Sequence, residues 1–272
     1  MARQASTDST FWTAVGAATA VGSRPFYFQG RVRYAPGPMC GRFLGSLLLA
    51  LLLSTPARAE TVTLSPSKDN TIFSESGSLS SGVGNALYSG KINIGPVRRA
   101  LLAFDVSSLP TSAVIDSVQL VLTVTNTPET TPRLFRVFRV LADWGEGASN
   151  SPLGMGAPAQ TNDATWANTF FPSSLWSTQG GDVAAAASDS TDVAGFGTYT
   201  WHSAGLASDV HGWTSQTSPN YGWMLIGSEA ITRSVREFSS REGGTPPQLT
   251  IYYSVATPVS QTTWGKIKIR YR

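Results

Sequence analysis

Apolar and polar residues alternate with a period of two along much of the chain after residue 60. In the clearest run, Val118, Leu120 and Leu122 fall on one face of a strand, and Gln119 and Thr123 fall on the other. Other strand-like runs cover 61–64, 100–104, 134–140, 223–226 and 248–253. Because Gly, Pro, Ser and Asn bound these runs and helical periodicity is scarce, we expect an all-β antiparallel sandwich.

One segment predicts a helix instead. Leu206, Val210 and Trp213 are spaced as i, i+4 and i+7, which places them on one helical face, and Gly212 is a plausible stop. We expect this short helix to cover one end of the sandwich. The stretch 148–198 loses the pattern and predicts long loops that carry a few short strands.

Residues 39–59 have the three-part pattern of a cleavable signal peptide. Arg42 is followed by the apolar run 43–53, by a Ser-Thr-Pro break, and by Ala57-Arg58-Ala59 as a small-x-small cleavage site. The apolar run is about half the roughly 20 residues that a membrane-spanning helix needs. We therefore expect an exported protein, secreted or at the cell surface, with no integral membrane span after cleavage.

The signal peptide sets the expected organisation of the chain. Translation is expected to start at Met39, with 1–38 as an upstream extension; the alternative is that 1–38 form an unusually long n-region of the signal peptide. Residues 60–255 are expected to form the sandwich, and 256–272 a basic C-terminal tail. The tail is interpreted either as a surface-attachment element or as a disordered end. The only cysteine of the chain, Cys40, lies inside the predicted signal, so the exported part contains no disulfide.

The charge of the exported part differs from that of the whole chain. The full sequence has 20 basic and 17 acidic residues, but six arginines and one aspartate lie in 1–59. The remainder therefore has 14 basic and 16 acidic residues. A nucleic-acid partner requires a clustered basic face, so this balance argues against one.

One run of the chain reads Arg98-Arg99-Ala100-Leu101-Leu102-Ala103-Phe104-Asp105-Val106-Ser107-Ser108-Leu109-Pro110. Shorter motifs lie before and after it, at 68–72, 118–122, 143–147, 164–166, 210–213, 221–225, 238–242 and 247–251. Together, over about 61–254, this ordered set resembles the DNRLRE domain, a family that overlaps the family 96 carbohydrate-binding modules. The resemblance implies a jelly-roll β-sandwich in exported, surface or polysaccharide-associated proteins, and it implies binding or scaffolding rather than catalysis.

The sequence contains no recognised catalytic motif. It has no Gly-x-Ser-x-Gly elbow, no His-Glu-x-x-His pair and no phosphate-binding Gly-rich loop ending in Lys. The remaining enzymatic alternative is a polysaccharide lyase or glycoside hydrolase with a pair of carboxylates, for which Glu146 and Glu242 are the first candidates. The simpler interpretation is that both acids hold loops by accepting hydrogen bonds.

A structural calcium ion is the one cofactor that the residues suggest. Asp69, Asp105, Asp143 and Glu146 lie at predicted strand ends or loops, where carboxylates and carbonyls converge on a hard cation. No EF-hand spacing is present.

Aromatic and basic residues suggest polysaccharide as a partner. Trp176, Phe171 and Phe170 lie in the loop-rich stretch, where exposed rings would stack on sugar, whereas Trp144, Trp166, Trp213 and Trp223 are expected to fill the core. Arg98 and Arg99, together with Arg236 and Arg241, either bind an acidic polysaccharide or pair with Asp105, Glu237 and Glu242 on the surface. We expect a non-catalytic module that binds carbohydrate or has a structural or adhesive role at the cell surface, with polysaccharide or surface proteins as partners.

Overall fold

The computed structural model describes residues 57–93 and 95–256. The expected extension 1–38, most of the signal peptide and nearly all of the basic tail lie outside the described residues. Cleavage after Ala59 would remove the first three residues of strand β1, which pair with Ser254, Val255 and Ala256.

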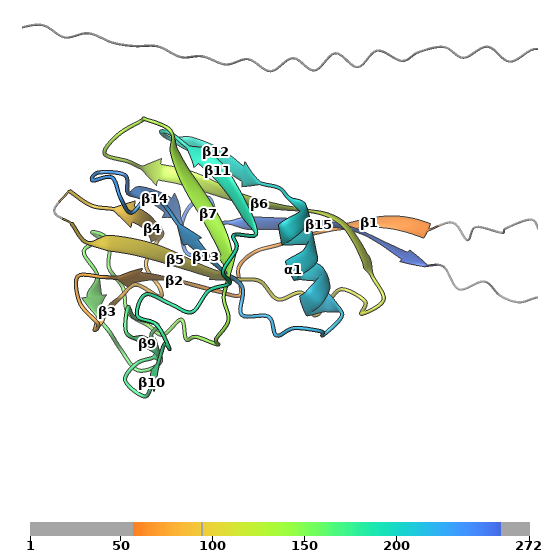
Figure 1. Ribbon diagram of the computed structural model, residues 1–272, viewed down its shortest axis with the longest axis horizontal. Helices are drawn as coiled ribbons and strands as arrows, with labels where there is room; N and C mark the ends of the chain where they lie inside the picture. Colours follow the sequence, from red (N-terminus) through yellow and green to blue (C-terminus); the bar gives the residue numbers. More distant parts are fainter. Residues whose placement is uncertain (1–56, 94, 257–272) are drawn as a thin grey trace, which may run out of the picture. The chain divides into compact units, whose positions relative to one another are not determined.

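The described part is built from strands and one helix (Figure 1). Their bounds are β1 Ala57–Leu64, β2 Lys68–Phe73, β3 Leu79–Ser80, β4 Ala86–Lys91, β5 Val97–Ala103, β6 Val114–Asn126, β7 Arg133–Arg139, β8 Ala157–Pro158, β9 Asn168–Phe170, β10 Ser174–Leu175, β11 Asp189–Val193, β12 Gly197–Trp201, α1 Ala204–Thr214, β13 Trp223–Ile226, β14 Arg236–Ser239 and β15 Gln248–Ala256.

The strands form two antiparallel layers. In the first layer β1, β15, β6, β14 and β4 are neighbours, and β12 pairs with the other edge of β6. In the second layer β2, β5, β13, β7 and β11 are neighbours, and β3 and β8 extend it beyond β2. Strand β4 pairs with both β14 and β5, so the layers are joined at that corner. The predicted all-β antiparallel sandwich with one helix is confirmed.

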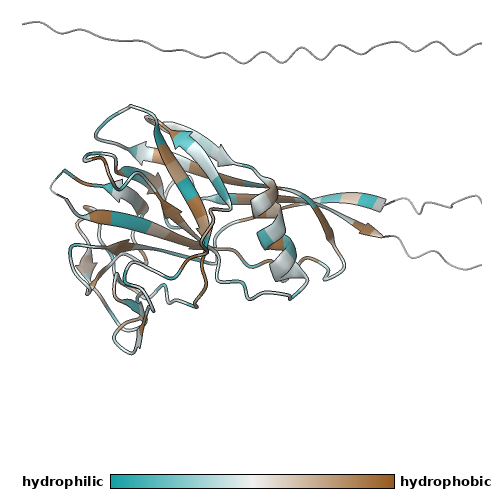
Figure 2. Ribbon diagram, viewed as in Figure 1, coloured by the Kyte–Doolittle hydropathy of each residue, from teal (hydrophilic) through white to brown (hydrophobic). Residues whose placement is uncertain are grey.

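The alternation in the sequence explains the main core between the layers. Val118, Leu120, Leu122 and Val124 of β6 are all buried there, and Figure 2 shows the same alternation as brown and teal bands along β7. The core also holds Phe104, Phe135, Trp201, Trp223 and Phe238.

Helix α1 closes the core against β6, as the spacing of its apolar residues predicts. Leu206, Val210 and Trp213 are buried, and the Trp213 ring lies 4.5 Å from that of Trp223 between centroids. The hydroxyl of Ser203 accepts a hydrogen bond from the Leu206 N–H and caps the helix.

Among the described residues, no helix has the length and apolar character that crossing a membrane requires.

Strand β5 is buried on both faces because a third layer covers the outer side of its sheet. Ala100 and Leu102 face the main core, whereas Leu101 and Ala103 belong to a second apolar cluster. The covering chain comes from the loop-rich stretch after β7 and includes β9 and β10, which Figure 1 shows on the side of β2 and β3. The second cluster consists of Ile72, Leu101, Ala103, Val140, Trp144, Ala164, Trp176 and Met224.

Candidate functional site

The covering layer uses tryptophans as core residues. Trp144 is fully buried and its indole N–H donates to the Tyr221 carbonyl at 2.8 Å. Trp176 is only 5% exposed, and its indole N–H donates to the Thr165 carbonyl at 2.9 Å. The expectation of an exposed Trp176 is therefore wrong, because its ring fills the space between the covering loop and the sheet. The core roles expected for Trp144, Trp213 and Trp223 are confirmed.

Phe170 is the last residue of β9, and Phe171 lies in the turn that follows it. Both are half-buried, and Phe170 pairs through the backbone with Ser174 in the β9–β10 hairpin. The backbone of Phe171 bonds with Asn162 and Asp163. Neither ring is among the residues that line the Arg99 pocket described below.

Arg99 lies at an open pocket beside the covering layer. Its Nε and Nη2 donate to the two carboxylate oxygens of Glu229 at 2.7 and 3.0 Å, and its Nη1 donates to the Gly180 carbonyl at 2.8 Å. The guanidinium stacks over the ring of Trp166, 4.9 Å from its centroid. This arrangement fixes the guanidinium beside the chain segment 177–183.

The Arg99 pocket has a volume of about 580 Å³ and is open to solvent. Its apolar side is formed by Leu141, Ala142 and Val183, and its polar side by Arg99, Ser177, Thr178, Gly181 and Asp182. Asp182 accepts the backbone N–H groups of Ser177 and Thr178, both at 2.8 Å, so the pocket wall is a hydrogen-bonded turn. Leu141 is 48% exposed, which leaves an apolar surface beside these polar groups.

Arg98 points to the opposite side of the sheet and is 6% exposed. Its Nε and Nη2 both donate to Glu75, at 3.2 and 2.9 Å, and it lies over the rings of Phe73 and Tyr88. Pairing of both arginines with carboxylates is confirmed, but the partners are Glu75 and Glu229 rather than Asp105, Glu237 or Glu242. The exposure that Arg98 would need for binding a polymer is absent.

Two of the predicted calcium ligands meet in a cluster with two residues from another loop. The Asp69 N–H donates to Oε1 of Glu146 at 2.8 Å, and Oδ2 of Asp69 accepts the Arg241 N–H at 2.7 Å. Nη2 of Arg241 lies 2.8 Å from both Glu146 and Glu242. We call Asp69, Glu146, Arg241 and Glu242 the acid–arginine cluster.

Burial governs the protonation of this cluster. Asp69 is fully buried and its Oδ1 has no hydrogen-bond partner. Desolvation raises the pKa of Asp69 to about 8, although the hydrogen bond from Arg241 opposes it. Desolvation also raises the pKa of Glu146, against the hydrogen bond from Asp69 and the charge of Arg241.

The other two predicted calcium ligands lie elsewhere. Asp143 pairs with Lys68 at 2.9 Å, and Asp105 is exposed and accepts the Ser107 N–H at 2.9 Å. Throughout 57–93 and 95–256, no group of three or more acidic, His or Cys side chains is arranged to hold a metal ion. Of the four predicted calcium ligands, only Asp69 and Glu146 are in contact with each other, and both also bond to Arg241.

The acid–arginine cluster joins three segments that are distant in sequence. Asp69 belongs to β2, Glu146 to the covering layer, and Arg241 and Glu242 to the turn between β14 and β15. Glu146 already accepts a hydrogen bond at each carboxylate oxygen. This geometry holds loops in place, which is the simpler of the two roles considered for Glu146 and Glu242.

Two buried polar residues that each make several hydrogen bonds, which we call hubs, were not identified from the sequence. The amide of Asn70 bonds with Glu146 and Ala164 carbonyls and with Ser80 and Ser81, so it fixes the covering layer to β2. Asn70 lies within the motif at 68–72, and this motif was the only feature of the sequence that pointed to it.

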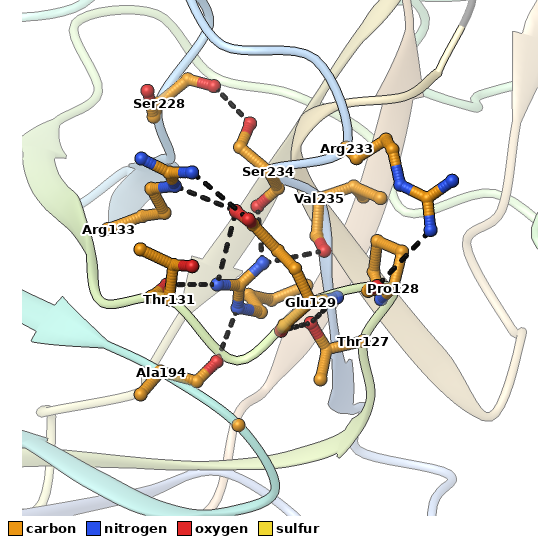
Figure 3. A network of polar contacts seen from close by, with 12 residues as sticks. Thr127, Pro128, Glu129, Thr131, Arg133, Ala194, Ser228, Arg233, Ser234 and Val235 are labelled. Atoms are coloured by element: carbon orange, nitrogen blue, oxygen red, sulfur yellow. Dashed lines mark hydrogen bonds and ion pairs between the residues drawn. The ribbon is translucent and has the colours of Figure 1, made fainter.

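Arg236 is the second hub and is fully buried, not on the surface as expected. It donates to the carbonyls of Thr131, Ala194, Ser234 and Val235. Glu129 lies 3.8 Å from it and binds Arg133 through both oxygens (Figure 3). No local sequence pattern distinguishes this arginine, because its acceptors come from three separate loops.

We compared the chain with models of protein families and with curated protein sequences, and neither comparison found a match.

Proposed function

We propose that this protein is an exported, non-catalytic β-sandwich module that binds carbohydrate in the Arg99 pocket. The observation that supports the proposal is the pocket itself, about 580 Å³ in volume, whose lining combines apolar side chains, the hydroxyl residues Ser177 and Thr178, and the fixed guanidinium of Arg99. Pockets of roughly 300–1,000 Å³ with a few oriented polar groups are typical of small-ligand sites. The resemblance to the DNRLRE family and the predicted signal peptide support the same role.

The charges of the pocket favour a neutral sugar. Glu229 neutralises Arg99, and Asp182 adds a carboxylate to the lining. A carboxylate on the ligand would therefore meet no unpaired cation there. Leu141 and Val183 offer apolar contact to the C–H face of a sugar ring, and the hydroxyls of Ser177 and Thr178 offer hydrogen bonds to its hydroxyls.

A substitution that fills the pocket tests the proposal. The full-length chain is screened on a glycan array and by pull-down with neutral and acidic polysaccharides. Thr178→Arg introduces a long side chain into the pocket and should weaken binding by about tenfold or more. Thr111→Arg, at an exposed turn before β6, is the matched control and should bind as wild type does.

Absence of binding by the folded protein to every polysaccharide tested would overturn the proposal. Self-association measured by light scattering would in that case favour the structural or adhesive role, with the same protein or other surface proteins as partners.

The enzymatic alternative rests on the convergence of Glu146 and Glu242 on Arg241. Release of reducing ends or unsaturated sugars from polysaccharide, abolished by Glu146→Gln or Glu242→Gln, would establish it. We favour binding because both acids are engaged in holding the loops.

A further inference from the structure

The outer face of the first layer differs from the covered outer face of the second. On β1, β15, β6 and β12, the residues that alternate with the core positions are exposed or half-exposed. Seven of them are threonines: Thr61, Thr63, Thr123, Thr125, Thr198, Thr200 and Thr250. We call this surface the threonine face.

The strand register places these threonines in rows across the sheet. Thr63 is opposite Thr250, which is opposite Gln119 on the next strand. Thr123 is opposite Thr198, and Val121 lies between Gln248 and Thr200. The rows cross up to three neighbouring strands, or roughly 10 Å at about 4.8 Å per strand.

Hydrogen bonds between opposite side chains hold the hydroxyls in position. The Oγ1 atoms of Thr63 and Thr250 are 3.1 Å apart, and those of Thr123 and Thr198 are 3.2 Å apart. A hydroxyl that shares one hydrogen bond in this way keeps donor or acceptor capacity for a ligand. Because these rotamers are already restricted, a ligand would order fewer side chains on binding.

The three rows just described carry no charged side chain, and two acids lie at the ends of the threonine face. Glu237 of β14 accepts a hydrogen bond from Oγ1 of Thr125 at 3.1 Å, and Asp116 accepts one from the Ser254 hydroxyl. Arg58 and Glu60 alternate with Thr61 and Thr63 and so project to the other side of β1, where Glu60 accepts the Tyr253 hydroxyl at 3.0 Å. Asp116 lies at the bulge opposite Tyr252 and Tyr253, at the rim. A solvated protein surface ordinarily has acidic and basic residues interspersed. In Figure 2, β12 has the pale colours of the middle of the hydropathy scale.

We propose that the threonine face binds the surface of a neutral polysaccharide. Threonine hydroxyls both donate to and accept from sugar hydroxyls, and the threonine methyls, Val121 and Tyr252 provide apolar contact for sugar C–H groups. With no cation in its rows, the face has nothing to pair with an acidic polymer. This inference rests on the proposed function for the class of ligand, but it assigns a second surface, on the layer opposite the one that carries the Arg99 pocket.

A second copy of the chain fits this face less well. Stable interfaces between identical chains are more apolar than the average surface, whereas this face consists mainly of hydroxyls that would all need partners when buried. An extended polymer supplies such partners along its whole length.

The test uses the full-length chain and pull-down on microcrystalline cellulose and on an insoluble β-1,3-glucan. The double variant Thr198→Glu/Thr250→Glu places charges on two separate strands of the face and should reduce retention by about tenfold or more, because a charge would lose water without gaining a partner. Thr198→Val/Thr250→Val keeps the shape and removes the hydroxyls, and should reduce retention less. Thr111→Glu/Ser112→Glu is the control outside the face and should bind as wild type does.

The outcomes separate this inference from the proposed function. If the wild type is retained and the Glu pair is retained equally, with circular dichroism unchanged, the threonine face is not the binding surface, and sensitivity to Thr178→Arg still supports the pocket. If a wild-type dimer seen by light scattering is lost in the Glu pair, the face is an interface between copies and the inference is wrong. Loss of retention in the Glu pair but not in Thr178→Arg would support the threonine face alone.

Discussion

Replacing Asp69 by Asn should remove a specific pH dependence from the stability of the domain. Asp69 is fully buried, and its pKa rises from 3.8 to about 8 on folding. Between these values the folded protein keeps a proton that the unfolded chain has released. Stability is therefore highest below the unfolded pKa and falls as the pH rises toward the folded one.

The size of the effect follows from the shift. One pKa unit corresponds to about 1.4 kcal/mol, so the wild type should lose roughly 4 kcal/mol of unfolding free energy between pH 5 and pH 8 from this group alone. The side-chain amide that Asp69→Asn introduces does not titrate in this range, and its carbonyl still accepts the Arg241 N–H that Asp69 accepts now. The slope of stability against pH should become shallower by about 1.4 kcal/mol per pH unit in Asp69→Asn.

Urea denaturation followed by tryptophan fluorescence at pH 5, 6, 7 and 8 measures this slope. Asp105→Asn is the matched control: the Ser107 hydrogen bonds hold the pKa of Asp105 below its usual value, so this group is ionised in both states throughout the range. Its variant should keep the wild-type slope. Equal slopes in the wild type and Asp69→Asn would refute the reasoning and would mean that Asp69 is ionised in the folded protein.

Three further substitutions test the packing that positions the candidate site, each by its urea midpoint. Arg236→Met should cost about 3–5 kcal/mol, because four carbonyls lose their buried donor; a cost within error of zero would contradict the hub role. Trp176→Ala should cost about 3–5 kcal/mol by leaving a cavity under the covering layer, whereas a cost below about 1 kcal/mol would indicate an exposed ring. Gly222→Ala should cost at least about 2 kcal/mol, because the backbone has φ +73° and a Cβ would clash with the Leu102 carbonyl oxygen; Gly244→Ala, which meets open space, is its control and should be nearly neutral.

The sequence predicted the strands that have a clear apolar pattern, either alternating, as in β6, or continuous, as in β5 and β13. β6, β7 and β15 alternate between apolar and polar residues because one face packs and the other meets water, and α1 is recognisable for the same reason. β2 has no such apolar pattern, because Asp69, Asn70 and Thr71 are polar although they are buried, and their hydrogen-bond partners come from distant parts of the chain. Alternation carries no information about a second covering layer.

The same physical reason limits what the sequence could predict about the site. Arg99 was named as a candidate, and it lines a pocket together with residues 177–183 of the loop-rich stretch. The aromatic candidates of that stretch, Trp176, Phe171 and Phe170, do not line it, and the polar residues of the loop that do were not predicted. Trp176 was misjudged because the environment of an aromatic ring within a loop depends on what the loop covers, which no local pattern records.

Unused hydrogen-bonding capacity, rather than chemical reactivity, distinguishes the candidate ligand surfaces from the structural polar residues. Arg98, Arg236 and Glu146 have the side chains that usually suggest a site, but each is already bonded within the fold. Breaking such bonds for a ligand would leave a buried group without a partner, at a cost of about 1–3 kcal/mol each. The hydroxyls of Thr178, Thr200 and Thr250 lie at the surface and can meet a sugar without that loss. Ligand binding by this domain is therefore expected at its neutral hydroxyl-bearing surfaces, and its charged residues are expected to affect folding more than affinity.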